Sequence, residues 1–121
     1  GLIPATISPY VIARMGEGQA RRVFMSARIF NAGEAMDMRL VSKCVEVSQL
    51  DEAVEMEVGP YLSVSSNAVG ASKALARFLG PKIDPEIIDA TIERLADTWE
   101  TPDALEGIEA FLDKRPPKWQ N

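Results

Sequence analysis

The chain contains no histidine, only one cysteine and no long apolar run. Without histidine, these 121 residues lack the commonest general base and the commonest metal ligand. Cys44 has no second cysteine to pair with, which fits a reducing compartment such as the cytoplasm. No stretch approaches the ~20 apolar residues that a membrane-spanning helix needs, so we expect no membrane partner.

Clustered basic residues are also lacking. The net charge is −5, and the 13 lysines and arginines are scattered along the chain. A nucleic-acid surface needs grouped cations to displace phosphate counterions, so we expect no nucleic-acid partner. The hydrophobic fraction of 46% and the charged fraction of 26% are typical of a soluble globular domain.

Helices are predicted over most of the chain. Ser8 and Pro9 open a short helix that Gly16 ends, and a second helix follows over residues 17–27. Asn31 and Glu34 have capping-box spacing, and so do Ser48 and Asp51. Further helices are expected over 66–79, after Asp84-Pro85-Glu86, and from Thr101-Pro102-Asp103 up to the Pro116-Pro117 stop.

Residues Leu40 to Val47 form the only predicted strand, since Val41, Val45 and Val47 would share one face. A lone strand needs a hydrogen-bonding partner that this sequence does not offer. The opening Gly1-Leu2-Ile3-Pro4 is apolar from its first residue, unlike a natural N-terminus. We therefore expect the chain to be part of a larger protein, the alternatives being an ordered extended loop at 40–47 and a tag remnant at the start.

No catalytic or metal-binding group emerges from the residues themselves. Cys44 lacks a neighbouring base and is predicted to be a small core residue. The acidic residues Asp51, Glu52, Glu55, Glu57, Glu106 and Glu109 are expected on solvated helix faces, and Met25, Met36, Met38 and Met56 are expected to fill gaps in the core.

Two runs carry a family resemblance. The first contains Gly1-Leu2-Ile3-Pro4, then Ala27-Arg28-Ile29-Phe30-Asn31-Ala32-Gly33-Glu34-Ala35, and ends at Leu40-Val41. The second is the closing run from Asp103 to Trp119, which is similar to "EG-x-x-AF-x-x-KR-x-P-x-[FW]". With this spacing the chain resembles the C-terminal part of the enoyl-CoA hydratase/isomerase (crotonase) family over essentially its whole length.

The resemblance implies a mainly α fold, the C-terminal helical portion of a crotonase-like ββα spiral with one short strand near residues 41–47. It implies that the parent is an enoyl-CoA hydratase, a lyase that adds water across the 2,3-double bond of an acyl-CoA thioester. Both catalytic glutamates and both oxyanion-hole N–H groups of such enzymes precede the Gly-x-Ile-Pro turn, so no catalytic residue is assigned here. No cofactor is expected beyond the coenzyme A carried by the substrate.

Matched positions suggest binding residues. Phe111 and Lys114 correspond to the Phe and Lys that contact the adenine and phosphates of coenzyme A in the family, chemistry that suits an aromatic ring and an ammonium group. The alternative is that Phe111 belongs to the helix core and Lys114 caps the helix end. Ile3, Pro4 and Ala5 would line the acyl end of the site.

Two departures from the family pattern bear on the substrate and on a turn. Ala5-Thr6-Ile7-Ser8 replaces the common glycine-rich continuation, and this variant resembles hydratases of branched glutaconyl-type CoA thioesters. Arg39 replaces a glycine before Leu40-Val41, so either Arg39 accepts a positive φ or the turn differs.

Residues 1–47 are assigned to the end of the crotonase core, and residues 48–121 to a C-terminal helical region for oligomerisation. The parent is expected to form a trimer or a dimer of trimers. Alternatives are another reaction of the family, such as double-bond isomerisation or thioester hydrolysis, and a non-catalytic helical interaction module.

Overall fold

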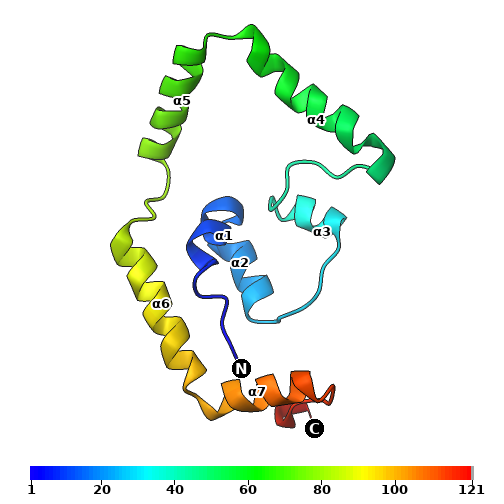
Figure 1. The fold of residues 1–121 in the computed structure, drawn as a ribbon, viewed down its shortest axis with the longest axis vertical. Coiled ribbons are helices and arrows are strands. Elements are labelled where there is room, and N and C mark those ends of the chain that lie inside the picture. Colours follow the sequence, from blue (N-terminus) through cyan, green and yellow to red (C-terminus); the bar gives the residue numbers. More distant parts are fainter. Residues whose placement is uncertain (121) are drawn as a thin grey trace. The chain divides into compact units, whose positions relative to one another are not determined.

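The structure is a computed structural model that describes residues 1–120 (Figure 1). These residues form two compact units. One unit contains residues 1–27 together with residues from 83 onward, and the other contains residues 28–82. The chain is mainly helical, as predicted.

The first unit begins with two short helices, α1 (Ser8–Met15) and α2 (Glu17–Phe24). Gly16 separates them with a φ of 80°, a value that glycine adopts without the steric cost of a Cβ. Its N–H donates to the Ile12 carbonyl over 2.8 Å, which closes α1 at the predicted residue. Helix α1 packs against α2 and also against α6.

The same unit continues with α6 (Pro85–Trp99), α7 (Pro102–Leu112) and a short 3-10 turn, η3 (Lys118–Gln120). Asp84 caps α6 by accepting the Ile87 N–H over 3.1 Å, and Thr101 caps α7 by accepting the Ala104 N–H over 3.2 Å. Both caps confirm the predicted helix starts. The Thr101 cap therefore fixes where α7 begins.

The second unit contains α3 (Ala32–Asp37), the 3-10 turn η1 (Val47–Gln49), α4 (Leu50–Val58), the 3-10 turn η2 (Gly59–Ser63) and α5 (Ser66–Leu79). Asn31 and Glu34 form the predicted capping box, with the Glu34 N–H donating to Asn31 Oδ1 over 2.9 Å and the Asn31 N–H donating to Glu34 Oε2 over 3.2 Å. Helix α4 gives way to η2 at Gly59-Pro60, because a proline cannot continue the helical hydrogen bonding.

Helix α3 ends in a Schellman motif with Arg39 in the left-handed region at a φ of 62°. The Leu40 N–H donates to the Ala35 carbonyl over 2.9 Å, and the Arg39 N–H donates to the Met36 carbonyl over 2.9 Å. Of the two alternatives for this position, the structure therefore shows the one in which arginine adopts the conformation that favours glycine.

Three predictions of local structure are wrong. Within residues 1–120 there is no strand, and the segment 43–46 is extended without ladder partners before the 3-10 turn η1 begins at Val47. Ser48 does not cap a helix either, because α4 begins at Leu50 behind Gln49, which makes no side-chain cap. Helix α2 also stops at Phe24, three residues before the predicted Ala27.

Predictions of burial fail as well for several side chains. Cys44 is exposed instead of buried in a core. Of the four methionines expected in the core, Met38 is buried, whereas Met25, Met36 and Met56 are exposed. The buried apolar residues are small or slender: Ala5, Met15, Ala20, Ala35, Met38, Ala104 and Ala110. The predicted division into a core part, residues 1–47, and an oligomerisation part, residues 48–121, concerns function and not the two compact units, and it stays a prediction.

Candidate functional site

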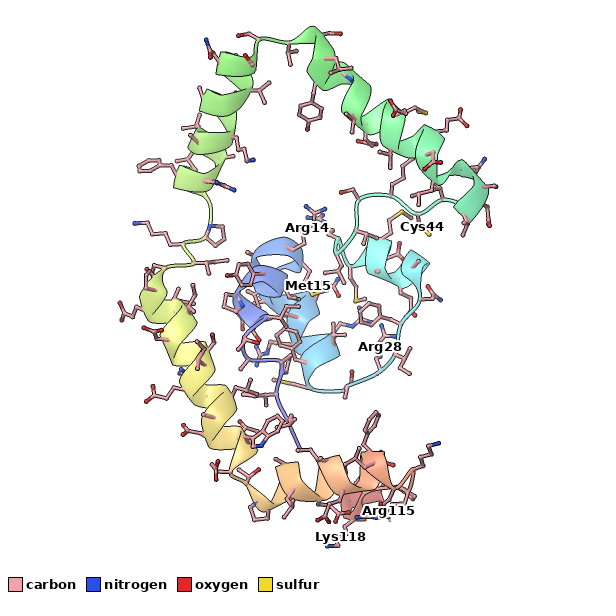
Figure 2. The ribbon with its side chains drawn as sticks, viewed as in Figure 1. Arg14, Met15, Arg28, Cys44, Arg115 and Lys118 are labelled. Atoms are coloured by element: carbon pink, nitrogen blue, oxygen red, sulfur yellow. The ribbon has the colours of Figure 1, made fainter. Side chains whose placement is uncertain are left out.

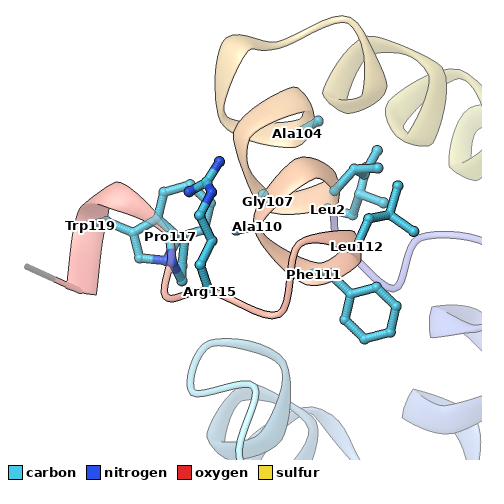
Figure 3. Close-up of a pocket in the computed structure, with 11 residues that line it drawn as sticks. Leu2, Ala104, Gly107, Ala110, Phe111, Leu112, Arg115, Pro117 and Trp119 are labelled. Atoms are coloured by element: carbon cyan, nitrogen blue, oxygen red, sulfur yellow. The ribbon is translucent and has the colours of Figure 1, made fainter.

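An apolar groove lies along α7 in the first unit (Figure 3). Its volume is about 460 Å³, and it is lined by Gly1 and Leu2, by Ala104, Gly107, Ile108, Ala110, Phe111 and Leu112 of α7, and by Arg115, Pro117 and Trp119 beyond the helix. The lining is largely apolar, and Arg115 is its charged side chain. Such a groove suits an aromatic or aliphatic group that carries an anion.

The absence of side chains at Gly1 and Gly107 lets the N-terminal segment and Trp119 lie close to the backbone of α7. A Cβ on Gly1 would lie 2.1 Å from the Asp103 carbonyl oxygen, so only glycine fits at this point of the N-terminal segment. A Cβ on Gly107 would lie 3.2 Å from Cη2 of Trp119 and 3.4 Å from the Gly1 nitrogen. The N-terminal segment and the C-terminal tail therefore meet on the same stretch of α7.

Glu106 joins α7 to the tail. Its carboxylate accepts a 2.7 Å hydrogen bond from Arg115 Nη1, another of 3.4 Å from Arg115 Nη2, and a third of 3.0 Å from the Lys118 N–H. Lys118 Nζ lies 3.2 Å from Oε2 of the same carboxylate. Figure 2 shows Arg115 and Lys118 together beside the end of α7.

These contacts keep Glu106 charged although its side chain is only 9% exposed. The hydrogen bond from Arg115, aided by those from Lys118 and opposed by desolvation, lowers the pKa of Glu106 from 4.5 to about 2. The same pair raises the pKa of Arg115. The network is therefore fixed and fully ionised at neutral pH, which suits a structural bridge and not a proton donor.

The end of α7 is a second Schellman motif, with Lys114 in the left-handed region at a φ of 54°. The Arg115 N–H donates to the Ala110 carbonyl over 3.0 Å, and the Lys114 N–H donates to the Phe111 carbonyl over 3.3 Å. Phe111 is 82% exposed, so it is not a helix-core residue. An exposed ring and a cation thus belong to the same turn.

The predicted acyl-site residues lie apart from this turn along the chain. Ile3 is 43% exposed, Pro4 is exposed, and Ala5 is buried with its N–H donating to the Ile3 carbonyl over 2.9 Å. They follow Leu2, which lines the groove, but they are not among its lining residues themselves. The structure therefore brings the start of the Gly-x-Ile-Pro turn, and not Ile3 to Ala5, against α7.

Sequence reasoning missed Glu106, which was expected on a solvated helix face and is buried instead. Composition and spacing carry no signal for it, because α7 ends at Leu112 and the chain turns back at the left-handed Lys114, ahead of the two prolines. That return leaves two cations near a carboxylate nine and twelve residues upstream.

Over residues 1–120, no group of three or more histidine, cysteine, aspartate or glutamate side chains is placed to hold a metal ion. Within the same residues, no helix combines the length and apolarity that crossing a bilayer requires. The groove residues offer mainly apolar surface, since the guanidinium of Arg115 is already paired with Glu106.

Comparisons with known proteins agree with these features. The sequence model described as enoyl-CoA hydratase/isomerase matches residues 1–121. The chain is 36% identical over 105 residues to the crotonyl-CoA hydratase of Syntrophomonas wolfei, an alignment covering 84% of this chain and 39% of that protein. This chain therefore spans well under half the length of that relative.

Solved structures give the same result. The enoyl-CoA hydratase of Shewanella pealeana matches with a TM-score of 0.61 and 36% identity, over 98% of this chain and 44% of that one. The enoyl-CoA hydratase/isomerase of Marinobacter aquaeolei matches with a TM-score of 0.60 and 30% identity, over 98% of this chain and 46% of that one. The agreement of motif, helical fold and full-length family match shows that the chain belongs to the enoyl-CoA hydratase/isomerase family.

Proposed function

We propose that this chain is the acyl-CoA-binding C-terminal part of an enoyl-CoA hydratase, which adds water across the 2,3-double bond of a CoA thioester. The observation that carries the proposal is the end of α7, where the exposed Phe111 lines an apolar groove and the left-handed Lys114 follows in the next turn. An aromatic face packs on a purine, and an ammonium group pairs with phosphate.

The acyl end of the substrate is assigned to Ile3, Pro4 and Ala5, because they follow directly on the segment that contacts α7. The run Ala5-Thr6-Ile7-Ser8, in place of the common glycine-rich continuation, supports a branched glutaconyl-type thioester as the substrate class. The catalytic glutamates belong outside these residues, so we expect the 121-residue chain by itself to show no hydration. The reaction needs no cofactor other than the coenzyme A of its substrate.

Steady-state kinetics of the complete protein test the proposal. We expect Phe111→Ala and Lys114→Ala each to raise the KM for an enoyl-CoA thioester by roughly 3- to 20-fold, since one stacked ring or one phosphate contact contributes about 1 kcal/mol or somewhat more. The kcat should change little because neither residue touches the reacting double bond. Unchanged KM values in both variants would remove the assignment.

Isomerisation of the double bond is the alternative reaction, since the matching family is described as hydratase/isomerase. The products discriminate: a hydratase consumes the conjugated enoyl absorbance and yields a hydroxyacyl thioester, whereas an isomerase yields a shifted alkene. A complete protein that only shifts the double bond would keep the binding site and change the reaction.

Homo-oligomerisation in the cytoplasm completes the proposal. In the second unit, Leu50, Val54, Val58, Tyr61 and Leu62 of α4 and η2 are exposed large apolar side chains. Such surface is typical of a subunit interface, and a trimer or a dimer of trimers is the assembly we expect. The exposed, unpaired Cys44 fits a reducing compartment. Light scattering of the complete protein tests the assembly.

A further inference from the structure

Glu106 is the buried charged group of α7, and it contacts the tail at two separate points. Arg115 reaches it as a fork, through Nη1 at 2.7 Å and Nη2 at 3.4 Å. The Lys118 backbone N–H reaches it at 3.0 Å. A side chain that binds both a guanidinium and a main-chain N–H restrains the conformation of the residues between them, because both ends of that segment are held.

The restrained segment is the turn that follows Phe111. It contains Lys114 with its left-handed φ of 54°, a conformation that costs free energy for a residue with a side chain. The Arg115 N–H closes the turn on the Ala110 carbonyl over 3.0 Å, so Arg115 holds the turn with its backbone and holds Glu106 with its side chain. Without Glu106, the turn would keep its strain and lose one of its two restraints.

Glu106 is not among the residues that line the groove, although its partner Arg115 is. Figure 3 shows Arg115, Pro117 and Trp119 on one side of α7, and Phe111 with Leu112 on the other. Any influence of Glu106 on a ligand at Phe111 therefore passes through Arg115 or through the backbone of the turn. This placement makes Glu106 a candidate positioning residue and not a contact residue.

We propose that Glu106, acting through Arg115 and the Lys118 backbone, positions Phe111 and Lys114 to receive the adenosine-phosphate end of coenzyme A. This inference rests on the proposed function, because it assumes that Phe111 and Lys114 bind that end. It adds that the nucleotide end of the substrate is recognised by a turn whose geometry is set by a carboxylate that does not line the groove.

Two substrates distinguish a positioning role of Glu106 from a general effect on the stability of the protein. The complete protein is assayed with an enoyl-CoA thioester and with the same acyl group on pantetheine, which lacks the adenosine phosphates. For Glu106→Gln we expect the KM for the CoA thioester to rise roughly 3- to 10-fold, the loss of about one phosphate contact. The KM for the pantetheine thioester and both kcat values should stay within about twofold of the parent's.

Glu109→Gln is the matched control, since it makes the same charge change on the same helix. Glu109 is 55% exposed and lies 3.9 Å from Arg115, so its removal leaves the main bridge intact. We expect this variant to keep the parent's ratio of the two KM values. Arg115→Lys is the second test variant, because it keeps the charge and loses the fork, and we expect it to change the ratio in the same direction as Glu106→Gln.

The outcomes distinguish a failure of the binding site at Phe111 and Lys114 from a failure of the positioning role of Glu106. If Phe111→Ala and Lys114→Ala leave the ratio of the KM values unchanged, the proposed binding site itself fails. If those variants change the ratio but Glu106→Gln and Arg115→Lys affect both thioesters alike, or neither, the site stands and the positioning role is refuted. A Glu106→Gln protein that does not fold leaves Arg115→Lys to decide the question.

Discussion

Substituting Lys114 by glycine should separate stability from binding, because the two effects have opposite signs. Lys114 occupies the left-handed region at a φ of 54°, where a side chain costs about 1–2 kcal/mol. Glycine removes that cost but gives up about 0.5–1 kcal/mol through its greater freedom in the unfolded chain. The expected net gain in the free energy of unfolding is therefore about 0.5–1 kcal/mol.

Lys114→Ala is the matched variant, since it removes the ammonium group and keeps the Cβ that causes the strain. Both variants should bind the CoA thioester equally weakly, whereas only Lys114→Gly should become more stable. For a domain of 150–250 residues, 1 kcal/mol corresponds to about 2–4 °C in Tm, so a gain of about 1–4 °C is expected. Thermal and urea unfolding of the complete protein would measure it. A glycine variant no more stable than the alanine variant would refute the strain argument at this turn.

Three further outcomes are expected. Because the folded-state pKa of Glu106 is lowered to about 2 from 4.5, its stabilising contribution is present above about pH 4.5 and is lost as the pH falls towards 2. The urea midpoints of the parent and of Glu106→Gln should therefore converge over that pH range. Midpoints that stay a constant distance apart would contradict the bridge. Thr101→Ala should cost about 1 kcal/mol in urea unfolding by removing the cap of α7, whereas Thr101→Ser should be nearly neutral. Gly107→Leu should lower the free energy of unfolding by about 1–3 kcal/mol, because the leucine side chain would collide with Trp119. In Gly107→Ala, the gain in helix propensity should offset the tight 3.2 Å contact. Equal stabilities of the two variants would show that this face of α7 is not packed.

Local chemistry made the helix starts predictable from the sequence. Asp84 and Thr101 precede prolines at the first helical position, and each cap bonds to a backbone N–H only three residues ahead. Such bonds depend on neighbours along the chain and not on the rest of the fold. Helix α5 has the predicted bounds, Ser66 to Leu79, and the structure shows that Ser65 caps its start.

The predicted strand failed because strand formation depends on a partner that sequence periodicity cannot supply. The valines at 41, 45 and 47 indicate extended backbone, and Glu46 is indeed extended at φ −62° and ψ 149°. The Gln49 N–H then donates to the Glu46 carbonyl over 2.9 Å and begins a 3-10 turn instead of a ladder. Burial of Cys44 was inferred from the strand and failed with it.

The candidate site was predictable only where the family motif names a residue. Phe111 and Lys114 follow from the closing run, and their binding role stays a prediction. Glu106 could not be found from helix periodicity, because its partners lie nine and twelve residues further along the chain. Their meeting depends on the left-handed turn at Lys114, which is a rare conformation for lysine and gives no signal in composition or spacing.

The bridge at Glu106 is better explained by conformational specificity than by stability. Taking a carboxylate and a guanidinium out of water costs free energy that their attraction only partly offsets, and well-packed apolar side chains often replace such a pair without loss. An apolar pair, however, would accept several arrangements of the tail, whereas a forked guanidinium and one backbone N–H define a single arrangement. A turn that must hold Lys114 in an unfavourable conformation gains from a restraint of that kind. We therefore infer that the buried charge of α7 serves the geometry of the turn more than the stability of the helix.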